Sequence, residues 1–181
     1  MNSALRITFG MLVGAVVASA ATPGPGSLNP QLPSWLRILR GPVNGGLIER
    51  EGKSLMVYGD PLGRQPAAEI VLLSEARRDV TWAARGLARA GAKVVAPEKE
   101  AEFLAHPEKF WAELREKRFH DYSQQTTKLP VEAVPISRTV KEGDTITWRD
   151  LSFRVLDTPG YTRGAVSYLV ELGGKKVAFT G

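Results

Sequence analysis

A short polar turn between two apolar segments holds the residue types in this chain that could do chemistry. The turn covers residues 74–80, SEARRDV, and carries the carboxylates of Glu75 and Asp79 with Arg77 between them. Two carboxylates suit hard ions such as magnesium or calcium only when more oxygen ligands are nearby. A guanidinium stays protonated and offers a metal no lone pair. The turn is therefore predicted to hold an internal Glu75–Arg77–Asp79 charge cluster.

The composition limits the alternative chemistries. The chain has 181 residues, no cysteine and two histidines, His106 and His120, which excludes disulfides, thiolate zinc sites and a cysteine nucleophile. A histidine-rich metal centre cannot be built from this chain alone. His106 precedes Pro107 and is expected at a helix boundary. His120, in the segment FHDYSQQ, could lie near a cleft, but a single histidine does not make a metal site.

The positive charge of the chain is spread out rather than concentrated. Lys and Arg number 24 against 19 Asp and Glu, a formal net charge of +5. In the segment PEKFWAELREKR, basic and acidic residues alternate as they do on a solvated helix face. No basic stripe with interleaved aromatic residues is present, so a nucleic-acid partner is not predicted.

Two aspartates also have simple structural explanations. Asp79 stands just before a predicted helix that starts near Val80, where an aspartate commonly caps the first turn. Asp60 precedes Pro61 after a predicted hairpin, and an aspartate at such a position commonly forms a turn. Both residues are therefore expected to have structural roles, whatever else they do.

The elements that position the turn are predicted from hydrophobic periodicity. Residues 45–59 alternate around Gly52-Lys53 as a β-hairpin does, and residues 68–73 read as a buried strand. A helix is expected over residues 80–90, with one face formed by Trp82, Ala83, Leu87 and Ala90, and with Gly91 as its C-terminal cap. A strand in AKVVAP follows, so the unit predicts a parallel pair of strands joined by a crossover helix.

The second half of the chain changes in character. Pro97 and Pro107 each stand at an expected first helical position, before EKEAEFLA and EKFWAELREKR. Short alternating strands are then predicted in VEAVPI, DTITW, LSFRVLDTP, AVSYLVEL and KKVAFTG, with Gly173-Gly174 as the last turn. The chain stops at the end of a strand with nothing to cover it, so the sequence is expected to be a fragment of a longer protein.

The N-terminus resembles an export signal. Arg6 precedes the apolar residues 7–18, and Ala18-Ser19-Ala20 fits a small-residue cleavage site. Residues 1–20 are thus predicted to be a signal peptide, and residues 21–40 a Pro/Gly-rich linker leading into the domain. The predicted location is secreted or periplasmic, with no transmembrane span in the mature chain. The alternative is a buried N-terminal helix.

Several segments, taken together, resemble the metallo-β-lactamase superfamily. They are NGGLIEREGKSLMVYGDP, EIVLLSEARRDVTWAARGLARAGAKVVAPEKEAEFL and FRVLDTPGYTRGAVSYLVELGGKKVAFTG. The last of them is the most specific, because many of its residues match the family's Thr-Pro-Gly-His-Thr-x-Gly-Ser segment in register. The resemblance runs from about residue 41 to 181, which would be the N-terminal portion of the domain. It implies an α/β (α+β) fold, an αββα sandwich truncated on its C-terminal side.

The resemblance also implies a zinc site, and the ligand positions depart from the family pattern. In the family, histidines and an aspartate hold one or two zinc ions, and the metal activates a bound water for hydrolysis. The histidine positions of the loop fall on Glu75, Arg77 and Val80, and the later histidine falls on Tyr161. Asp79 alone matches, as a remnant metal position, so no cofactor is expected in this chain although the family uses zinc.

Two functions of different classes follow from this pattern. The first is a non-catalytic pseudo-hydrolase that keeps the fold to bind a small molecule or a protein. The second is a metal-dependent hydrolase with an altered site completed beyond residue 181. In an incomplete sandwich, part of the inner face is expected to lack its cover, around Val155, Val166, Leu169 and Val177.

Overall fold

The computed structural model describes residues 36–65, 67–118, 130–172 and 174–180. The predicted signal peptide, most of the predicted linker, His120 and Gly173 lie outside the described residues. None of the described helices is long and apolar enough to cross a membrane. The first described element already belongs to a sheet, so four residues of the segment 21–40 contribute a strand to the domain.

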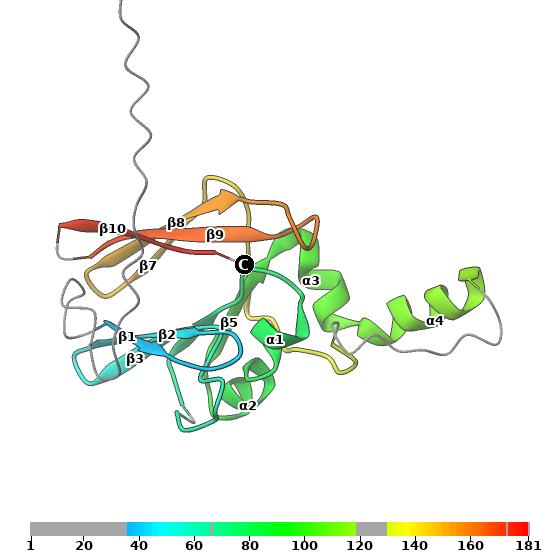
Figure 1. Ribbon diagram of the computed structural model, residues 1–181, viewed down its shortest axis with the longest axis horizontal. Coiled ribbons are helices and arrows are strands. Elements are labelled where there is room, and N and C mark those ends of the chain that lie inside the picture. The colour runs from blue at the N-terminus through cyan, green and yellow to red at the C-terminus, as the bar shows by residue number, and fades with distance from the viewer. Residues whose placement is uncertain (1–35, 66, 119–129, 173, 181) are drawn as a thin grey trace, which may run out of the picture. The chain divides into compact units, whose positions relative to one another are not determined.

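Two sheets face one another in this domain (Figure 1). The first contains, in spatial order, β1 (Leu36–Leu39), β2 (Gly45–Arg50), β3 (Lys53–Val57), β4 (Ile70–Leu72), β5 (Lys93–Pro97) and β6 (Arg138–Val140). Strands β1 to β3 pair antiparallel and β3 to β6 pair parallel. The parallel order places the ends of β3, β4 and β5 along one edge, where the loops of α/β proteins commonly carry a site.

The second sheet is antiparallel throughout. Its order is β10-β9-β8-β7, built from β7 (Thr145–Trp148), β8 (Leu151–Asp157), β9 (Val166–Leu172) and β10 (Lys175–Phe179). Buried and exposed residues alternate along β7 and β8, which is the pattern of strands with one face on a core.

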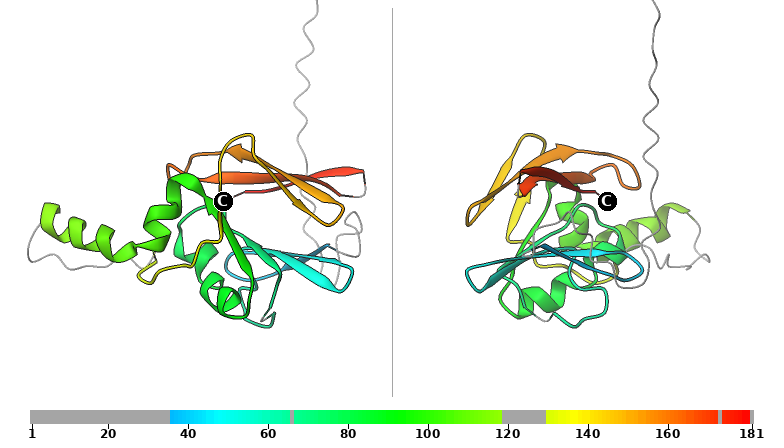
Figure 2. Two further views of the ribbon diagram at one scale, coloured as in Figure 1. Left: turned by 180° about the vertical axis from the view of Figure 1, so that it is seen from behind. Right: turned by 60° about the vertical axis from the view of Figure 1, so that its left-hand side comes forward.

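In the part of the chain that the structure describes, four helices accompany the first sheet: α1 (Arg78–Thr81), α2 (Ala84–Arg89), α3 (Glu98–Ala105) and α4 (Pro107–Arg118). Leu87 of α2 and Leu104 of α3 pack on one face of this sheet with Leu47, Met56 and Val71. Helix α2 lies beneath the first sheet, and α4 projects away from the two sheets (Figures 1 and 2).

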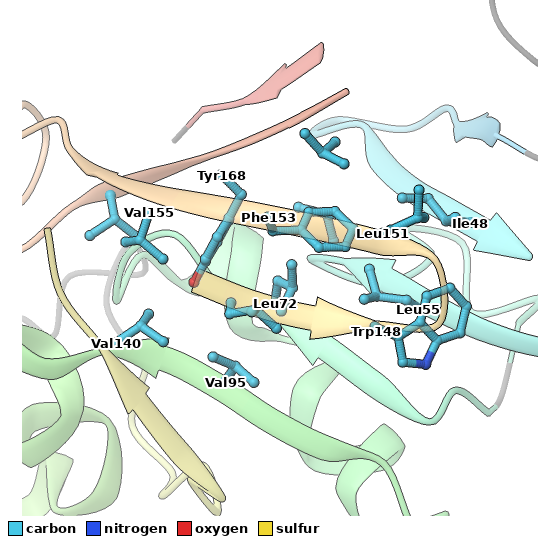
Figure 3. Packing of buried hydrophobic residues seen from close by; sticks show 14 of the residues in the cluster. Ile48, Leu55, Leu72, Val95, Val140, Trp148, Leu151, Phe153, Val155 and Tyr168 are labelled. Carbon is cyan, nitrogen blue, oxygen red and sulfur yellow. The ribbon is translucent and has the colours of Figure 1, made fainter. Parts of the chain in front are cut away.

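The main core fills the space between the two sheets. Leu55 and Leu72 of the first sheet meet Phe153 and Tyr168 of the second, all fully buried (Figure 3). The Tyr168 hydroxyl donates a hydrogen bond to the Leu73 carbonyl across the sandwich at 2.6 Å. Because neighbouring residues of β2, Leu47 and Ile48, are buried on opposite faces, the first sheet is covered on both sides.

The structure confirms many of the predicted elements. The hairpin forms, although its turn is Glu51-Gly52, because Arg50 pairs with Lys53. Strands β4 and β5 are the predicted parallel pair, and Gly91 has the positive φ of 98° that ends the intervening helical segment. The strands predicted in DTITW, LSFRVLDTP, AVSYLVEL and KKVAFTG are β7, β8, β9 and β10.

Other predictions were wrong. The single helix expected over residues 80–90 is two short helices, and Trp82 at the break is 47% exposed instead of lying on the buried face. The segment VEAVPI forms no strand, since β6 begins at Arg138. Pro97 is the N-cap of α3 rather than its first residue, whereas Pro107 does begin α4.

The inner face of the second sheet is better covered than the sequence suggested. Val155 and Val166 are buried in the core between the sheets, so the prediction that they would lack cover was wrong. Val177 is partly buried and packs against the same core. Strands β2, β3 and β4 supply the cover, because their own inner faces carry a continuous apolar surface.

Candidate functional site

The polar turn follows β4 at the edge where the parallel strands end. Leu73 donates its backbone N–H to the Val95 carbonyl, which keeps the chain in line with β5 for one more residue. The Ser74 carbonyl then accepts a hydrogen bond of 2.9 Å from the N–H of Val166, the first residue of β9. The turn therefore lies against the loop that joins β8 to β9, and both sheets contribute to the site.

Glu75 is a buried acid in this turn. Its side chain is 1% exposed, and the Nε of Arg77 lies 3.4 Å from its Oε1. Burial raises the pKa of Glu75 and the nearby carboxylate of Glu100 adds to the rise, while the positive charge of Arg77 opposes it. The net direction is upward, so the environment favours the neutral form of Glu75 more than water does.

Arg77 joins the turn to the β8–β9 loop. Its guanidinium carbon lies 5.4 Å from the centre of the Tyr161 ring, a distance typical of a cation–π contact. Tyr161 itself is 52% exposed, so the pair forms part of the surface. The ion pair on one side and the aromatic ring on the other fix the Arg77 side chain.

Helix α3 also holds the β8–β9 loop. The buried Glu100 accepts a hydrogen bond of 2.7 Å from the backbone N–H of Gly164, and Lys99 pairs with Asp157 at 2.5 Å. A Cβ on Gly164 would come within 2.5 Å of the Glu100 Oε1. The loop therefore needs glycine here for the backbone to approach the carboxylate.

Tyr58 stands where β3 ends, beside the same turn. Its φ of 69° lies in the left-handed region, which is rare for a bulky residue. Its hydroxyl donates a hydrogen bond of 2.6 Å to the carbonyl of Thr180, just after β10. Burial raises the pKa of Tyr58, with a smaller contribution from Glu75 in the same direction, so the phenol stays a donor.

Five buried polar atoms in this region find no hydrogen-bond partner among the described residues. They are the Ser74 Oγ, the two carboxylate oxygens of Glu75, the Nε of Arg77 and the Oγ1 of Thr162. Native proteins pair nearly all such atoms, with protein, water or a ligand.

The predicted charge cluster is confirmed for two of its three members. Glu75 and Arg77 pair, but Asp79 is exposed and forms no ion pair within the described part of the chain. The prediction that Asp79 caps a helix was also wrong, because Arg77 is the N-cap of α1 and no side chain caps it. Asp79 lies in the first turn of α1 instead.

Two other sequence-based expectations have clear outcomes. Asp60 is buried and organises the turn after β3, where it accepts hydrogen bonds from the backbone N–H groups of Leu62 and Arg64. The Arg64 side chain donates two further hydrogen bonds to the same carboxylate and lowers the pKa of Asp60. His106 ends α3 just before Pro107, at the expected helix boundary.

The donors at the family's ligand positions do not fit a zinc ion. Val80 is fully buried in the core between the sheets and has no donor atom, and Arg77 brings a fixed positive charge. Within the described residues, no group of three or more His, Asp or Glu side chains is arranged to hold a metal. Zinc requires about four donors in a near-tetrahedral arrangement, which these side chains do not provide.

Sequence reasoning missed Glu100, Ser74 and Thr162. Glu100 occupies one of several acidic positions in EKEAEFLA, and nothing in the periodicity singles it out. Ser74 and Thr162 are small polar residues in loops, a very common combination. Gly164 did carry a signal, because it matches the glycine of the motif segment in register, and the structure gives that glycine its contact with Glu100.

Comparison with known proteins shows the fold. No protein-family model matches the chain. A hydroxyacylglutathione hydrolase of Cupriavidus metallidurans is 48% identical over 48 residues, which cover 25% of this chain and 18% of that protein. Similar solved structures are metallo-β-lactamases. One from Cronobacter sakazakii, named for its HARLDQ motif, is 20% identical with a TM-score of 0.59, over 80% of this chain and 60% of that chain.

Two further solved structures support the same assignment. The subclass B3 enzyme BJP-1 of Bradyrhizobium japonicum is 18% identical with a TM-score of 0.59, over 83% of this chain and 60% of that chain. A B3 metallo-β-lactamase named for an active-site glutamic acid is 24% identical with a TM-score of 0.54, over 75% of this chain and 54% of that chain. The chain thus has the metallo-β-lactamase fold and spans about 60% of the length of the first two of these structures.

Proposed function

We propose that this chain is an exported, non-catalytic relative of the metallo-β-lactamase-fold hydrolases that uses the turn after β4 to bind a partner. The observation that carries the proposal is the Glu75–Arg77–Tyr161 arrangement. These three residues occupy positions where the family's pattern has histidines, and here Arg77 contacts both of the others. A turn whose side chains already pair is suited to recognition and poorly suited to holding a metal ion.

The positive charge of Arg77 supports binding over hydrolysis. A divalent ion beside a fixed guanidinium is repelled, and Val80 offers no lone pair to compensate. Hydrolysis by zinc enzymes depends on the metal lowering the pKa of a bound water. Without that centre there is no metal-activated water, and hydrolysis of lactams, thioesters or phosphodiesters by the zinc mechanism is not expected.

Calorimetric titration of the purified full-length protein with zinc tests the proposal, together with assays on lactam, thioester and phosphodiester substrates. We expect no stoichiometric sub-micromolar zinc binding and no hydrolysis above background. Stoichiometric zinc binding that disappears in Asp79→Ala and persists in the matched surface variant Glu108→Ala would overturn the proposal. The comparison separates a specific site from adsorption of zinc on surface carboxylates.

The second candidate function is metal-dependent hydrolysis with an altered set of ligands, completed outside residues 1–181. The structure named for its HARLDQ motif favours it, because EARRDV at residues 75–80 shares Ala, Arg and Asp with that motif in the same order. Another similar structure is named for a glutamic acid in its active site, and Glu75 is a residue of the same type. Zinc-dependent turnover that is lost in Glu75→Gln would establish this second function.

Returning histidines to the family's ligand positions tests whether this turn differs from a zinc loop only in its side chains or also in its backbone. The triple variant Glu75→His, Arg77→His, Tyr161→His is expected to bind zinc more tightly than the wild-type protein if the backbone is that of a zinc loop. Adding Val80→His, to complete the family pattern, places an imidazole in the core between the sheets, where Val80 is fully buried. Burying a polar group without a partner costs about 1–3 kcal/mol, so this fourth change is expected to lower stability.

A further inference from the structure

We propose that the outer face of α1 and α2 binds a membrane surface that carries anionic lipids. The face is formed by Arg78, Trp82, Arg85 and Arg89, together with Leu62 of the turn after β3, and we refer to it as the arginine–tryptophan face. It contains no member of the Glu–Arg–Tyr arrangement in the neighbouring turn. The inference therefore goes beyond the proposed function and stands without it.

Helical spacing places the arginines and the tryptophan in one row. Trp82 and Ala83, the two residues between α1 and α2, keep right-handed helical backbone angles. Positions 78, 82, 85 and 89 are therefore spaced as i, i+4, i+7 and i+11 along one helical face. Ala84 and Leu87 occupy the opposite face and pack against the first sheet. The row consequently lies on the outer side of the helices, where its members are exposed or half-exposed.

Two large apolar side chains stand together at the centre of this face. Trp82 is 47% exposed and Leu62 is 58% exposed. A Cβ on Gly63 would have the Cη2 atom of Trp82 as its nearest neighbour, at 3.9 Å, so the turn that carries Leu62 lies against the indole ring. Single exposed apolar residues are common, whereas neighbouring ones form the kind of patch that marks an interaction surface.

The turn that presents Leu62 is held in place. The buried Asp60 carboxylate accepts hydrogen bonds from the backbone N–H groups of Leu62 and Arg64, at 3.0 and 2.8 Å, and from the Arg64 side chain. A Cβ on Gly59 would come within 2.6 Å of the Ala83 Cβ, so the start of the turn packs closely on the junction of the two helices. Because the apolar pair is already ordered, little conformational entropy is lost when it binds.

The charge around the apolar pair is positive. Arg78 and Arg89 are exposed and form no ion pair with any residue that the structure describes. Arg85 pairs with the exposed Glu132, a kind of surface ion pair that contributes little stability and can exchange for another anion. These three arginines, against Glu132 and the exposed Asp79, leave an excess of one positive charge. The face is therefore complementary to an anionic surface.

A lipid surface fits these side chains better than a folded protein does. Tryptophan is enriched where proteins meet the headgroup region of a membrane, and arginine binds phosphate oxygens in a bidentate manner. The guanidinium of Arg64 adds a further cation, since its side chain is 56% exposed while that of Asp60 is 1% exposed. A Cβ on Gly86, on the outer side of α2, would meet no atom within 4 Å. The helix surface is thus open to a broad, phosphate-rich layer.

The test uses the full chain and two kinds of vesicle, phosphatidylcholine alone and phosphatidylcholine mixed with phosphatidylglycerol. Residues 7–18 are apolar as well, so binding is compared between variants of the same chain. We expect stronger binding to the anionic vesicles, a loss of that preference at high salt, and a blue shift of tryptophan emission that is absent in Trp82→Phe. Arg78→Ala and Arg89→Ala are each expected to weaken binding to anionic vesicles about fivefold.

The matched controls are Arg154→Ala, which removes an exposed arginine from β8, and Ile38→Ser, which removes an exposed apolar side chain from β1. Both are expected to bind as the wild-type protein does, whereas Leu62→Ser is expected to bind more weakly. Equal binding to the two kinds of vesicle, or unchanged affinity in both arginine variants of the face, would overturn the inference.

An acidic protein partner would give a different result. Poly-glutamate would then bind as tightly as the anionic vesicles do, and the vesicles would cause no shift of the Trp82 emission, an outcome that also overturns the inference. If Trp82→Phe fails to fold by circular dichroism, Leu62→Ser decides the matter, because an exposed turn residue can be replaced without disturbing the core.

Discussion

At the scale of single residues, Glu75 makes the stability of the protein depend on pH. Its carboxyl group is buried, and its pKa is raised above the ordinary value by burial and by Glu100, against the effect of Arg77. An acid whose pKa is higher in the folded state binds its proton more tightly there than in the unfolded chain. The stability it contributes is complete below the unfolded pKa and is lost as the pH rises through the folded pKa.

We therefore expect the free energy of unfolding of the wild-type protein to contain a component that falls with rising pH and is absent in Glu75→Gln. Glutamine keeps the size of the side chain and cannot ionise. The measurement is urea unfolding of both proteins across the range from about pH 4 to pH 8, where carboxyl groups with raised pKa values titrate. A difference between the two proteins that does not change with pH would contradict the assignment.

Residue types alone predicted the contact between Glu75 and Arg77. They also predicted that Asp79 would join this charge cluster, which it does not. The sequence places three charged residues at alternate positions and does not show which of them are buried. Burial separates them in the structure, because Glu75 points into the protein while Asp79 lies on the exposed side of α1. The contribution of Glu100 was out of reach, since it depends on where α3 packs against a loop 64 residues away.

At the scale of elements, the contact between α3 and the β8–β9 loop has a direct test. Gly164→Ala would place a methyl group 2.5 Å from the Glu100 Oε1 and 2.8 Å from the Lys99 Cβ, so the helix and loop must move apart. Overpacking of this kind costs about 1–3 kcal/mol. We expect the loss to appear as a lower midpoint in urea unfolding, together with weaker Arg77–Tyr161 contact.

The matched control for that variant is Gly86→Ala in α2. A Cβ at Gly86 meets no atom within 4 Å, and the residue lies inside a helix. Alanine there is expected to raise stability by about 0.5–1 kcal/mol, because glycine weakens helix interiors. Equal effects of the two substitutions would show that the Glu100–Gly164 contact does not constrain the loop.

Elements with a clear hydrophobic period could be predicted from the sequence. Elements whose conformation depends on packing against distant residues could not. Alternation in LSFRVLDTP and turn glycines located the strands of the second sheet well. The break between α1 and α2 contains no proline or glycine, so the sequence does not predict it. At this break Trp82 is exposed to solvent. VEAVPI has an apolar pattern because Val134 packs beneath the first sheet, although the segment forms no strand.

At the scale of the whole molecule, the core between the sheets is expected to unfold as a unit. Phe153 of β8 is fully buried against residues of both sheets (Figure 3). Phe153→Ala removes a large buried side chain, which typically costs about 3–5 kcal/mol. Arg154→Ala, one position along the same strand and exposed, should change stability by less than about 0.5 kcal/mol.

Coincident transitions by far-ultraviolet circular dichroism and tryptophan fluorescence would show that the two sheets unfold together in Phe153→Ala. Trp148 of β7 is the natural reporter, since it is buried in the same core and donates a hydrogen bond to Glu69. Separate transitions in the variant would mean that the sheets are independent units.

Export also concerns the whole chain. Arg6, the apolar residues 7–18 and Ala18-Ser19-Ala20 lead us to expect cleavage after Ala20. Mass spectrometry of secreted or periplasmic protein should then find Ala21 as the first residue. Removal of Arg6 changes the count of Lys and Arg from 24 to 23 against 19 acidic residues, so the mature net charge becomes +4. Soluble protein that retains Met1 would contradict this prediction.

The sandwich arrangement has a consequence for how the chain is made. The inner face of the first sheet, with Leu55 and Leu72, is covered by Phe153 and Tyr168 from strands synthesised roughly a hundred residues later. At a translation rate of about 5–20 residues per second, that apolar face stays uncovered for on the order of ten seconds before the second sheet is synthesised. We therefore expect β2, β3 and β4 to be open to chaperones during synthesis, and slower translation between β6 and β9 to lengthen the interval in which nascent chains can aggregate.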